Sequence, residues 1–192
     1  MRSKNGNGKL LSDLPDTGNG GGVGRVRFGD ERVWLSPAGG EFGLGELARE
    51  LARFMAEEAE SSYRLVIGSD SQTKRWNGAS AVDFVTAVVI HRVGKGARYF
   101  WRKEREEKRY FLRDKIYRET MLSLEVAQVL VPELRRVLNG EKYTLEIHID
   151  VGQAGPTREM IAEVVGMVTG NGFLAKTKPE SWGASTVADK YA

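Results

Sequence analysis

The stretch Arg64-Leu-Val-Ile-Gly-Ser-Asp-Ser-Gln72 decides the fold that we predict for this chain. Its three consecutive apolar residues, 65–67, are typical of a β-strand that is covered on both faces. Gly68 has no side chain, so another segment can approach the backbone closely there. Asp70 follows at the expected carboxyl end of the strand, where α/β proteins place their sites. A single Asp after a strand is more often a turn or cap residue, so its meaning depends on other carboxylates.

Length and composition indicate one globular domain. The chain has 192 residues, of which 41% are hydrophobic, enough for one substantial core. It contains no cysteine, which excludes a disulfide framework, a thiol nucleophile and cysteine-ligated zinc. Neither a signal peptide nor an apolar run of membrane-spanning length is present, so we expect a cytoplasmic protein without a membrane partner. The net charge of +3 permits nucleic-acid binding without arguing for it.

The N-terminal part divides into a tail and a helical extension. Residues 1–24 are rich in glycine and asparagine and are predicted to form a flexible tail. Residues 25–192 are predicted to form the single domain. Within it, the sequence GLGELARELARFMAEEAE after Phe42 spaces its apolar residues at helical intervals, which predicts an amphipathic helix that packs on the core.

Two more strands are predicted to follow Asp70. Residues 71–80 are polar and end in a Trp76-Asn77-Gly78 turn, after which residues 81–93 and 97–102 read as strands of an antiparallel meander. The mixed run Arg102–Arg109 (RKEREEKR) alternates in sign. We interpret it as a solvated face or a strand-helix connection rather than a nucleic-acid patch.

A carboxylate lies on the apolar face of the longest predicted helix. Residues 110–138 form this helix, which we expect to break or kink near Pro132. Helical spacing places Glu119 between Ile116 and Ser123 on the face that packs on the sheet. A buried carboxylate is costly unless it is hydrogen-bonded, paired or bound to a metal. The alternative is a Glu at the edge of the apolar stripe that reaches solvent.

The C-terminal third repeats the pattern of strand and helix. Residues 143–150 alternate clearly as a strand that ends at Asp150, and Pro156 suits the start of a helix that continues through Val168. Residues 173–177 read as a short last strand. A final helix from Trp182 carries Asp189, in a last turn that we expect to fray unless Tyr191 or the terminus is anchored.

This order of elements, with one acid on each of four of them, resembles the ribonuclease H fold. The motifs are similar to those of the YkuK-type family of predicted RNase H-related nucleases: Ile67-Gly-Ser-Asp-Ser-Gln72, Glu119-Thr120, His148-Ile-Asp-Val-Gly152, Lys178-Pro-Glu-Ser181 and Ala184-Ser-Thr-Val-Ala-Asp189. The resemblance implies an α/β fold with a mixed five-stranded sheet, three antiparallel strands followed by two parallel strands, flanked by helices. It also implies that Asp70, Glu119, Asp150 and Asp189 converge to hold two divalent cations.

The chemistry of these residues is consistent with that resemblance. Several carboxylates share a small site only when cations neutralise them, and oxygen ligands favour Mg²⁺ or Mn²⁺. Two such ions support phosphodiester hydrolysis, which predicts a nuclease that acts on RNA, DNA or a hybrid. His148 shares a strand face with Asp150 and is a candidate for proton transfer, for orienting a carboxylate, or for a structural role. Groups expected around the acids or substrate are Gln72, Thr120, Lys178, Ser181 and Ser185.

Three alternatives compete with an RNase H-related nuclease. The chain is alternatively a non-catalytic nucleic-acid-binding or scaffold module that keeps the fold. Asp150-Val-Gly-Gln-Ala-Gly155 also suits the phosphate loop of an actin-like kinase, although such proteins normally need two domains. A DnaQ-like exonuclease is disfavoured because its first strand carries two acids one residue apart, whereas Asp70 is followed by Ser71-Gln72. No basic handle for a hybrid is evident in the sequence.

Overall fold

A computed structural model describes residues 33–192, except 77–78, 141 and 153–157. The predicted tail at residues 1–24, the Asn77-Gly78 turn and the helix start at Pro156 lie outside the described residues. The elements, in chain order, are β1 (Trp34–Leu35), β2 (Glu41–Phe42), α1 (Leu44–Ala56), β3 (Tyr63–Trp76), β4 (Ala79–Arg92), β5 (Gly96–Glu106), α2 (Leu112–Val137), β6 (Tyr143–His148), η1 (Arg158–Met160), α3 (Ile161–Gly170), β7 (Leu174–Lys176) and α4 (Gly183–Tyr191).

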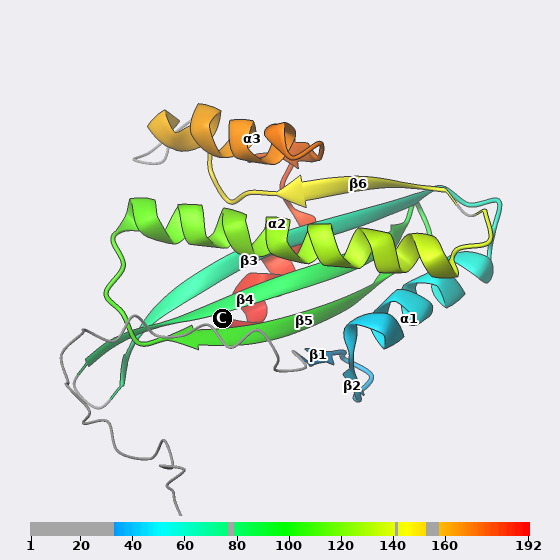
Figure 1. Cartoon of the computed structure of the whole chain (residues 1–192), viewed down its shortest axis with the longest axis horizontal. Helices are drawn as coiled ribbons and strands as arrows, with labels where there is room; N and C mark the ends of the chain where they lie inside the picture. The colour runs from blue at the N-terminus through cyan, green and yellow to red at the C-terminus, as the bar shows by residue number, and fades with distance from the viewer. Residues whose placement is uncertain (1–32, 77–78, 141, 153–157) are drawn as a thin grey trace, which may run out of the picture. The chain divides into compact units, whose positions relative to one another are not determined.

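One mixed sheet forms the centre of the fold (Figure 1), with the strand order β2-β1-β5-β4-β3-β6-β7. The strands β3, β4 and β5 form the predicted antiparallel meander, and β6 pairs in parallel with β3, as the helical crossover through α2 requires. The sheet has seven strands and not the five expected, because β1 and β2 add to the β5 edge. Each has only two residues, too few for a periodic signal in the sequence.

Helices cover the two faces of the sheet unequally. Apolar residues of α1, α2 and α3 pack against one face, in a core that includes Leu65, Ile67 and Ile147. The other face carries α4, whose Ala184 and Ala188 pack against Val66 and its neighbours on β4. Figure 1 shows α2 and α4 on opposite sides of the sheet. Burial on both faces explains why strand β3 begins as a continuous apolar run.

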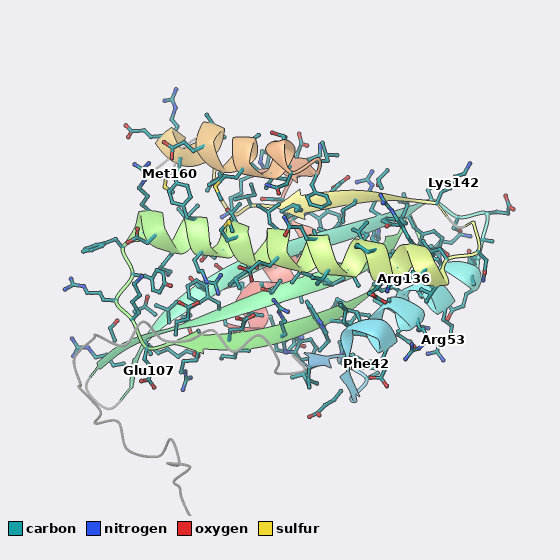
Figure 2. The ribbon with its side chains drawn as sticks, viewed as in Figure 1. Phe42, Arg53, Glu107, Arg136, Lys142 and Met160 are labelled. Atoms are coloured by element: carbon teal, nitrogen blue, oxygen red, sulfur yellow. The ribbon has the colours of Figure 1, made fainter. Side chains whose placement is uncertain are left out.

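The first two long strands extend beyond their predicted ends. β3 pairs with β4 from Tyr63 opposite Arg92 to Trp76 opposite Ala79, so the polar residues after Asp70 remain in the sheet. Asp70 therefore lies inside a strand and not at its end. β5 similarly continues to Glu106, so the first half of the charged run is strand and not connection. Figure 2 shows Glu107 at one end of β5, with Phe42 and Arg53 near the other end.

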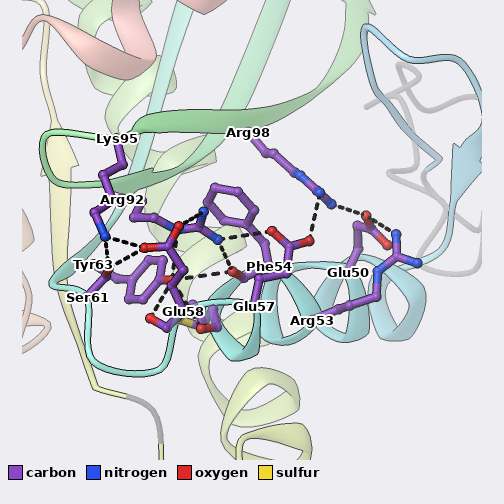
Figure 3. Close-up of polar contacts among 11 residues, drawn as sticks. Glu50, Arg53, Phe54, Glu57, Glu58, Ser61, Tyr63, Arg92, Lys95 and Arg98 are labelled. Carbon is purple, nitrogen blue, oxygen red and sulfur yellow. Dashed lines mark hydrogen bonds and ion pairs between the residues drawn. The ribbon is translucent and has the colours of Figure 1, made fainter.

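The helix α2 runs through Pro132 as one continuous element, so the expected break is absent from this described segment. At its carboxyl end lies α1, which is tied to the sheet by a network of charged groups (Figure 3). The buried guanidinium of Arg92 lies 4.2 Å from the centre of the Phe54 ring and donates to the hydroxyl of Tyr63 at 2.9 Å. It also pairs with Glu57 and Glu58, each at 3.0 Å. This network joins α1 to β3 and β4.

Candidate carboxylate site

The candidate site lies along the part of β3 that extends beyond the end of β6. The parallel pairing of the two strands ends at Gly68 opposite His148, whereas β3 runs on for eight more residues to Trp76. In the described structure this edge of β3 has no strand partner beyond Gly68. Helices on the two faces of the sheet can therefore both approach Asp70 at this unpaired edge of β3. Backbone topology thus creates the place where carboxylates from separate elements meet.

Gly68 brings α4 close to β3, as the sequence predicted for this position. A Cβ atom there would lie 2.8 Å from the Cβ of Ala184 and 2.9 Å from the carbonyl oxygen of His148. Both distances are shorter than a Cβ atom allows, so α4 can pack this closely on β3 only because residue 68 is a glycine. The contact fixes the start of the helix that carries Asp189.

The four predicted acids are brought into one electrostatic neighbourhood. Burial raises the pKa of the Asp70 carboxyl, and the charges of Asp150 and Asp189 raise it further. Burial also raises the pKa of Glu119 to about 8, and the charges of Asp70 and Asp150 contribute to that rise. Glu119 is on α2 and Asp189 is on α4, so the acids arrive from both sides of the sheet. Each carboxylate disfavours the charged form of its neighbours.

Protein donors offset part of this repulsion. The hydroxyl of Ser71 donates to Oε1 of Glu119 at 2.5 Å, and the ammonium of Lys178 lies 2.6 Å from Oδ1 of Asp150. Lys115 donates to the carbonyl oxygen of Ser71 at 3.3 Å, and its charge lowers the pKa of Glu119. Sequence reasoning missed Lys115 and Ser71. The signal for Lys115 was its position four residues before Glu119, one helical turn along the same face.

His148 is buried at the end of β6, and both of its ring nitrogens are engaged. Its Nδ1 accepts a hydrogen bond from the backbone N–H of Gly183 at 3.3 Å, and its Nε2 lies 3.1 Å from Oε2 of Glu146. Burial lowers the pKa of the imidazole, which favours a neutral ring with the proton on Nε2. This geometry suits a residue that holds the start of α4 better than one that transfers protons.

The other predicted site residues differ in their burial and in their contacts. Thr120 is buried and donates to the carbonyl oxygen of Ile116 in its own helix, and Ser181 is buried just before α4. Gln72 is exposed on β3, two residues beyond Asp70. The side chain of Ser185 lies outside the described residues. Of this group, Lys178 forms an ion pair with a predicted acid, Asp150.

The end of α4 is anchored, which removes the expected fraying at Asp189. The Tyr191 ring stacks on Trp101 of β5, with ring centroids 3.8 Å apart and planes at 9°. Lys74 donates to the carbonyl oxygen of Ala192 at 3.2 Å, and Lys103 donates to that of Tyr191 at 3.4 Å. Cations at a helix carboxyl end also favour its dipole. Asp189 is therefore held on a docked helix.

The fit to a divalent cation rests on the donor set. The four carboxylates, among which burial and neighbouring acids raise the pKa of Asp70 and Glu119, provide the hard oxygen ligands that Mg²⁺ and Mn²⁺ prefer. Within the part of the chain that the structure describes, no three Asp, Glu or His side chains form a ready-made metal site. Lys178 neutralises Asp150 in this arrangement. The chemistry of the residues fits a cation that takes over this neutralising role.

A separate cavity lies away from the four predicted carboxylates. A cavity of about 660 Å³ opens between the β1–β2 turn, α1 and β5, lined in part by Phe42, Phe100 and Arg98. The residues that line it include none of the four carboxylates. Its position is unrelated to the carboxylate site.

The fold and the gathered acids define an RNase H-like α/β protein. Comparison with known sequences agrees: residues 46–192 match the Ribonuclease H-like family, and the chain belongs to that family. It is 33% identical over 156 residues to the uncharacterized protein YkuK of Bacillus subtilis (strain 168), an alignment that covers 76% of this chain and 88% of the relative. No solved structure matches significantly. Among the described residues, no helix is long and apolar enough to cross a membrane.

Proposed function

We propose that this protein is a divalent-metal-dependent phosphodiester hydrolase that acts on nucleic acid. One observation supports the proposal: burial and the charges of acids on other elements raise the pKa of Asp70 on β3 and of Glu119 on α2, beside the part of β3 that extends beyond β6. Sites with such perturbed acids are concentrated where ligands and catalysis are found. Membership of the Ribonuclease H-like family supports the same class of chemistry.

The residues that would hold the cations are Asp70, Glu119, Asp150 and Asp189. Bound Mg²⁺ or Mn²⁺ would supply charge neutralisation and an activated water for attack on a phosphodiester. The remaining work belongs to the chain's own groups. The hydroxyl of Ser71 orients Glu119, and Lys178, when released from Asp150, is placed to contact a substrate phosphate. His148 keeps α4 in position through the N–H of Gly183.

The test is cleavage of labelled single-stranded, duplex, hybrid and branched substrates with Mg²⁺ or Mn²⁺. We expect cleavage by the parent protein and a loss of at least about a hundredfold in Asp70→Asn, which keeps the shape of the side chain and removes its charge. Glu133→Gln, at a partly exposed position of α2 where the carboxylate pairs with Arg136, is the matched control and should retain activity. Cleavage that persists in Asp70→Asn would come from a contaminant and would refute the proposal.

A second candidate is a nucleic-acid-binding or scaffold module with the same fold. The observation that favours it is the lack of a ready-made group of three metal ligands in the described structure. Calorimetric titration with Mn²⁺ separates the two candidates. A hydrolase should bind Mn²⁺ with heat that disappears in Asp70→Asn, whereas the module should give no heat that depends on the four acids.

A further inference from the structure

The strand β5 separates the charges of the mixed run onto opposite faces of the sheet. Successive side chains of a strand alternate, so Lys103 and Arg105 share one face, and Glu104 and Glu106 share the other. On the latter face, Arg118 of α2 lies 2.8 Å from Glu106 and 3.9 Å from Glu104. Two acids of the run, Glu104 and Glu106, are thereby paired beneath α2. The two cations remain on the face that carries α4.

A buried carboxylate organises those cations. Asp83 of β4 is fully buried and lies directly opposite Arg105 of β5 in the sheet. The guanidinium of Arg105 donates to both carboxylate oxygens of Asp83, at 2.6 and 3.0 Å. Lys103 lies 3.0 Å and Lys74 3.1 Å from Oδ2 of the same carboxylate. This Asp83 cluster consists of three cations and one carboxylate, and the charge of Glu107 also acts on its Arg105. One carboxylate does not require three cations, since the bidentate arginine already satisfies it.

The two lysines of the Asp83 cluster retain N–H donors that can bind a further anion. The side chains of Lys74, Lys103 and Arg105 are 37–38% exposed, whereas Asp83 beneath them has no exposed surface. A lysine ammonium has three N–H donors. Lys74 and Lys103 each direct one donor at Asp83 and one at a carbonyl at the end of α4, which leaves a third for an external acceptor. The exposed outer surface of the cluster is therefore basic.

The cluster lies beside the carboxylate site on the same strand and face. Lys74 follows Asp70 by four residues, an even number, so both side chains point to the α4 face at a separation of about 13 Å along the strand. Phosphates of one nucleic-acid strand advance by about 3.4 Å each along a helix axis. The separation thus corresponds to roughly three or four phosphates. An extended polyanion that reaches the acids can contact Lys74 and Lys103 at the same time.

We propose that the Asp83 cluster is the surface that holds the phosphate backbone of one nucleic-acid strand as it leads to the carboxylate site. The inference rests on the proposed function, because it identifies how the substrate of that site is bound. The contacts are to phosphate rather than to bases, so they position the strand without reading its sequence. Their strength falls as salt concentration rises.

The test measures binding without cleavage. A labelled single-stranded oligonucleotide of about 20 nucleotides is titrated with protein in EDTA at several salt concentrations, and affinity is followed by fluorescence anisotropy. The double variant Lys74→Gln/Lys103→Gln should bind about tenfold more weakly, with a salt slope smaller by about 1.4, or 0.7 for each lost phosphate contact. The control Arg53→Gln/Arg136→Gln removes the same charge from exposed helix positions and should change neither value. Equal effects of the two double variants would overturn the inference.

A second variant separates binding from stability. Asp83→Asn preserves shape but leaves the three cations without their carboxylate, so it should lower the melting temperature and yet bind the oligonucleotide several-fold more tightly. A cluster with only a structural role predicts lower stability with unchanged affinity, and that result would overturn the inference. So would a parent protein that does not bind. Binding that depends on the cluster, without cleavage in Mg²⁺ or Mn²⁺, would refute the hydrolase and uphold the binding surface.

Discussion

Two groups of charged side chains on the same sheet follow opposite electrostatic rules. In the Arg92 network of Figure 3, cations and acids alternate, so that Arg92 lies between Glu57 and Glu58 and donates to the carbonyl oxygen of Phe54 at 2.7 Å. In the carboxylate site, four acids share the charges of two lysines, 115 and 178. The network pairs its own charges, whereas at the carboxylate site a divalent cation would offset the repulsion that remains. We propose that this difference separates a structural cluster from a ligand site.

The largest expected effect is the loss of the Arg92 network. Arg92→Met removes five contacts of a buried side chain, among them the hydrogen bonds that Arg92 donates to the carbonyl of Phe54 and to the hydroxyl of Tyr63, so the melting temperature should fall by several degrees. Arg92→Lys keeps the charge but not the fork of donors and should recover only part of the loss. Thermal unfolding measures both. Cleavage per folded molecule should be unchanged, and a selective loss of cleavage would contradict the distinction drawn here.

An intermediate effect, of opposite sign, is expected at Glu119. Glu119→Gln relieves repulsion in the metal-free protein and deletes a ligand, so stability without metal should stay equal or rise while stabilisation by Mn²⁺ and any cleavage fall. Paired melting curves with and without Mn²⁺ measure this. If the variant gains as much stability from Mn²⁺ as the parent protein, Glu119 is not a ligand.

The same residue predicts a pH dependence. The folded pKa of Glu119, about 8, lies above its ordinary value of 4.5, so the folded state holds a proton that the unfolded state releases between these values. Stability of the metal-free protein is therefore highest below about pH 4.5 as far as this group is concerned, and it declines as pH rises towards 8. Glu119→Gln should flatten that decline, which melting curves at pH 5 to 8 in EDTA can measure. An identical decline in both proteins would contradict the assignment.

The smallest expected effect concerns Lys178. Its side chain is 58% exposed, so the ion pair with Asp150 should contribute less than about 1 kcal/mol to stability. Lys178→Gln should bind Mn²⁺ a few-fold more tightly, because the ammonium no longer competes with the metal for Asp150, and should cleave nucleic acid more slowly. Calorimetry and the cleavage assay measure the two changes. Weaker Mn²⁺ binding in the variant would show that Lys178 supports the metal and does not compete with it.

Much of the fold could be predicted because its signals are local. The apolar run before Gly68, the alternation in residues 143–150 and the spacing of α2 each reflect one element's contact with the core, and their order implied the meander and the parallel β6. The two-residue strands β1 and β2 had no such signal. The extension of β3 past Asp70 was missed because pairing with β4, and not the apolar pattern, keeps residues 71–76 extended.

The candidate site could be predicted by residue type but not by its internal contacts. The sequence placed Asp70, Glu119, Asp150 and Asp189 on elements that the structure brings into one electrostatic neighbourhood. It did not reveal Lys115, whose charge acts across to β3, nor the aromatic stack that anchors α4. The spacing of Lys115 from Glu119 is a local signal, but the contact of Lys115 with Ser71 and the aromatic stack join residues far apart in the chain, and no local pattern encodes those contacts.

The sequence by itself determined the periodicities, the close approach at Gly68 and the supply of four acids, because each depends on the residue and its immediate neighbours. Only the tertiary structure determined on which face of the sheet, and against which partners, the charges of Arg102–Arg109 lie. In the linear order they interleave, but the strand turns Glu104 and Glu106 towards Arg118 and Lys103 and Arg105 towards Asp83. The physical reason is that charge acts through space, and a pleated strand separates neighbours in sequence onto opposite faces of the sheet.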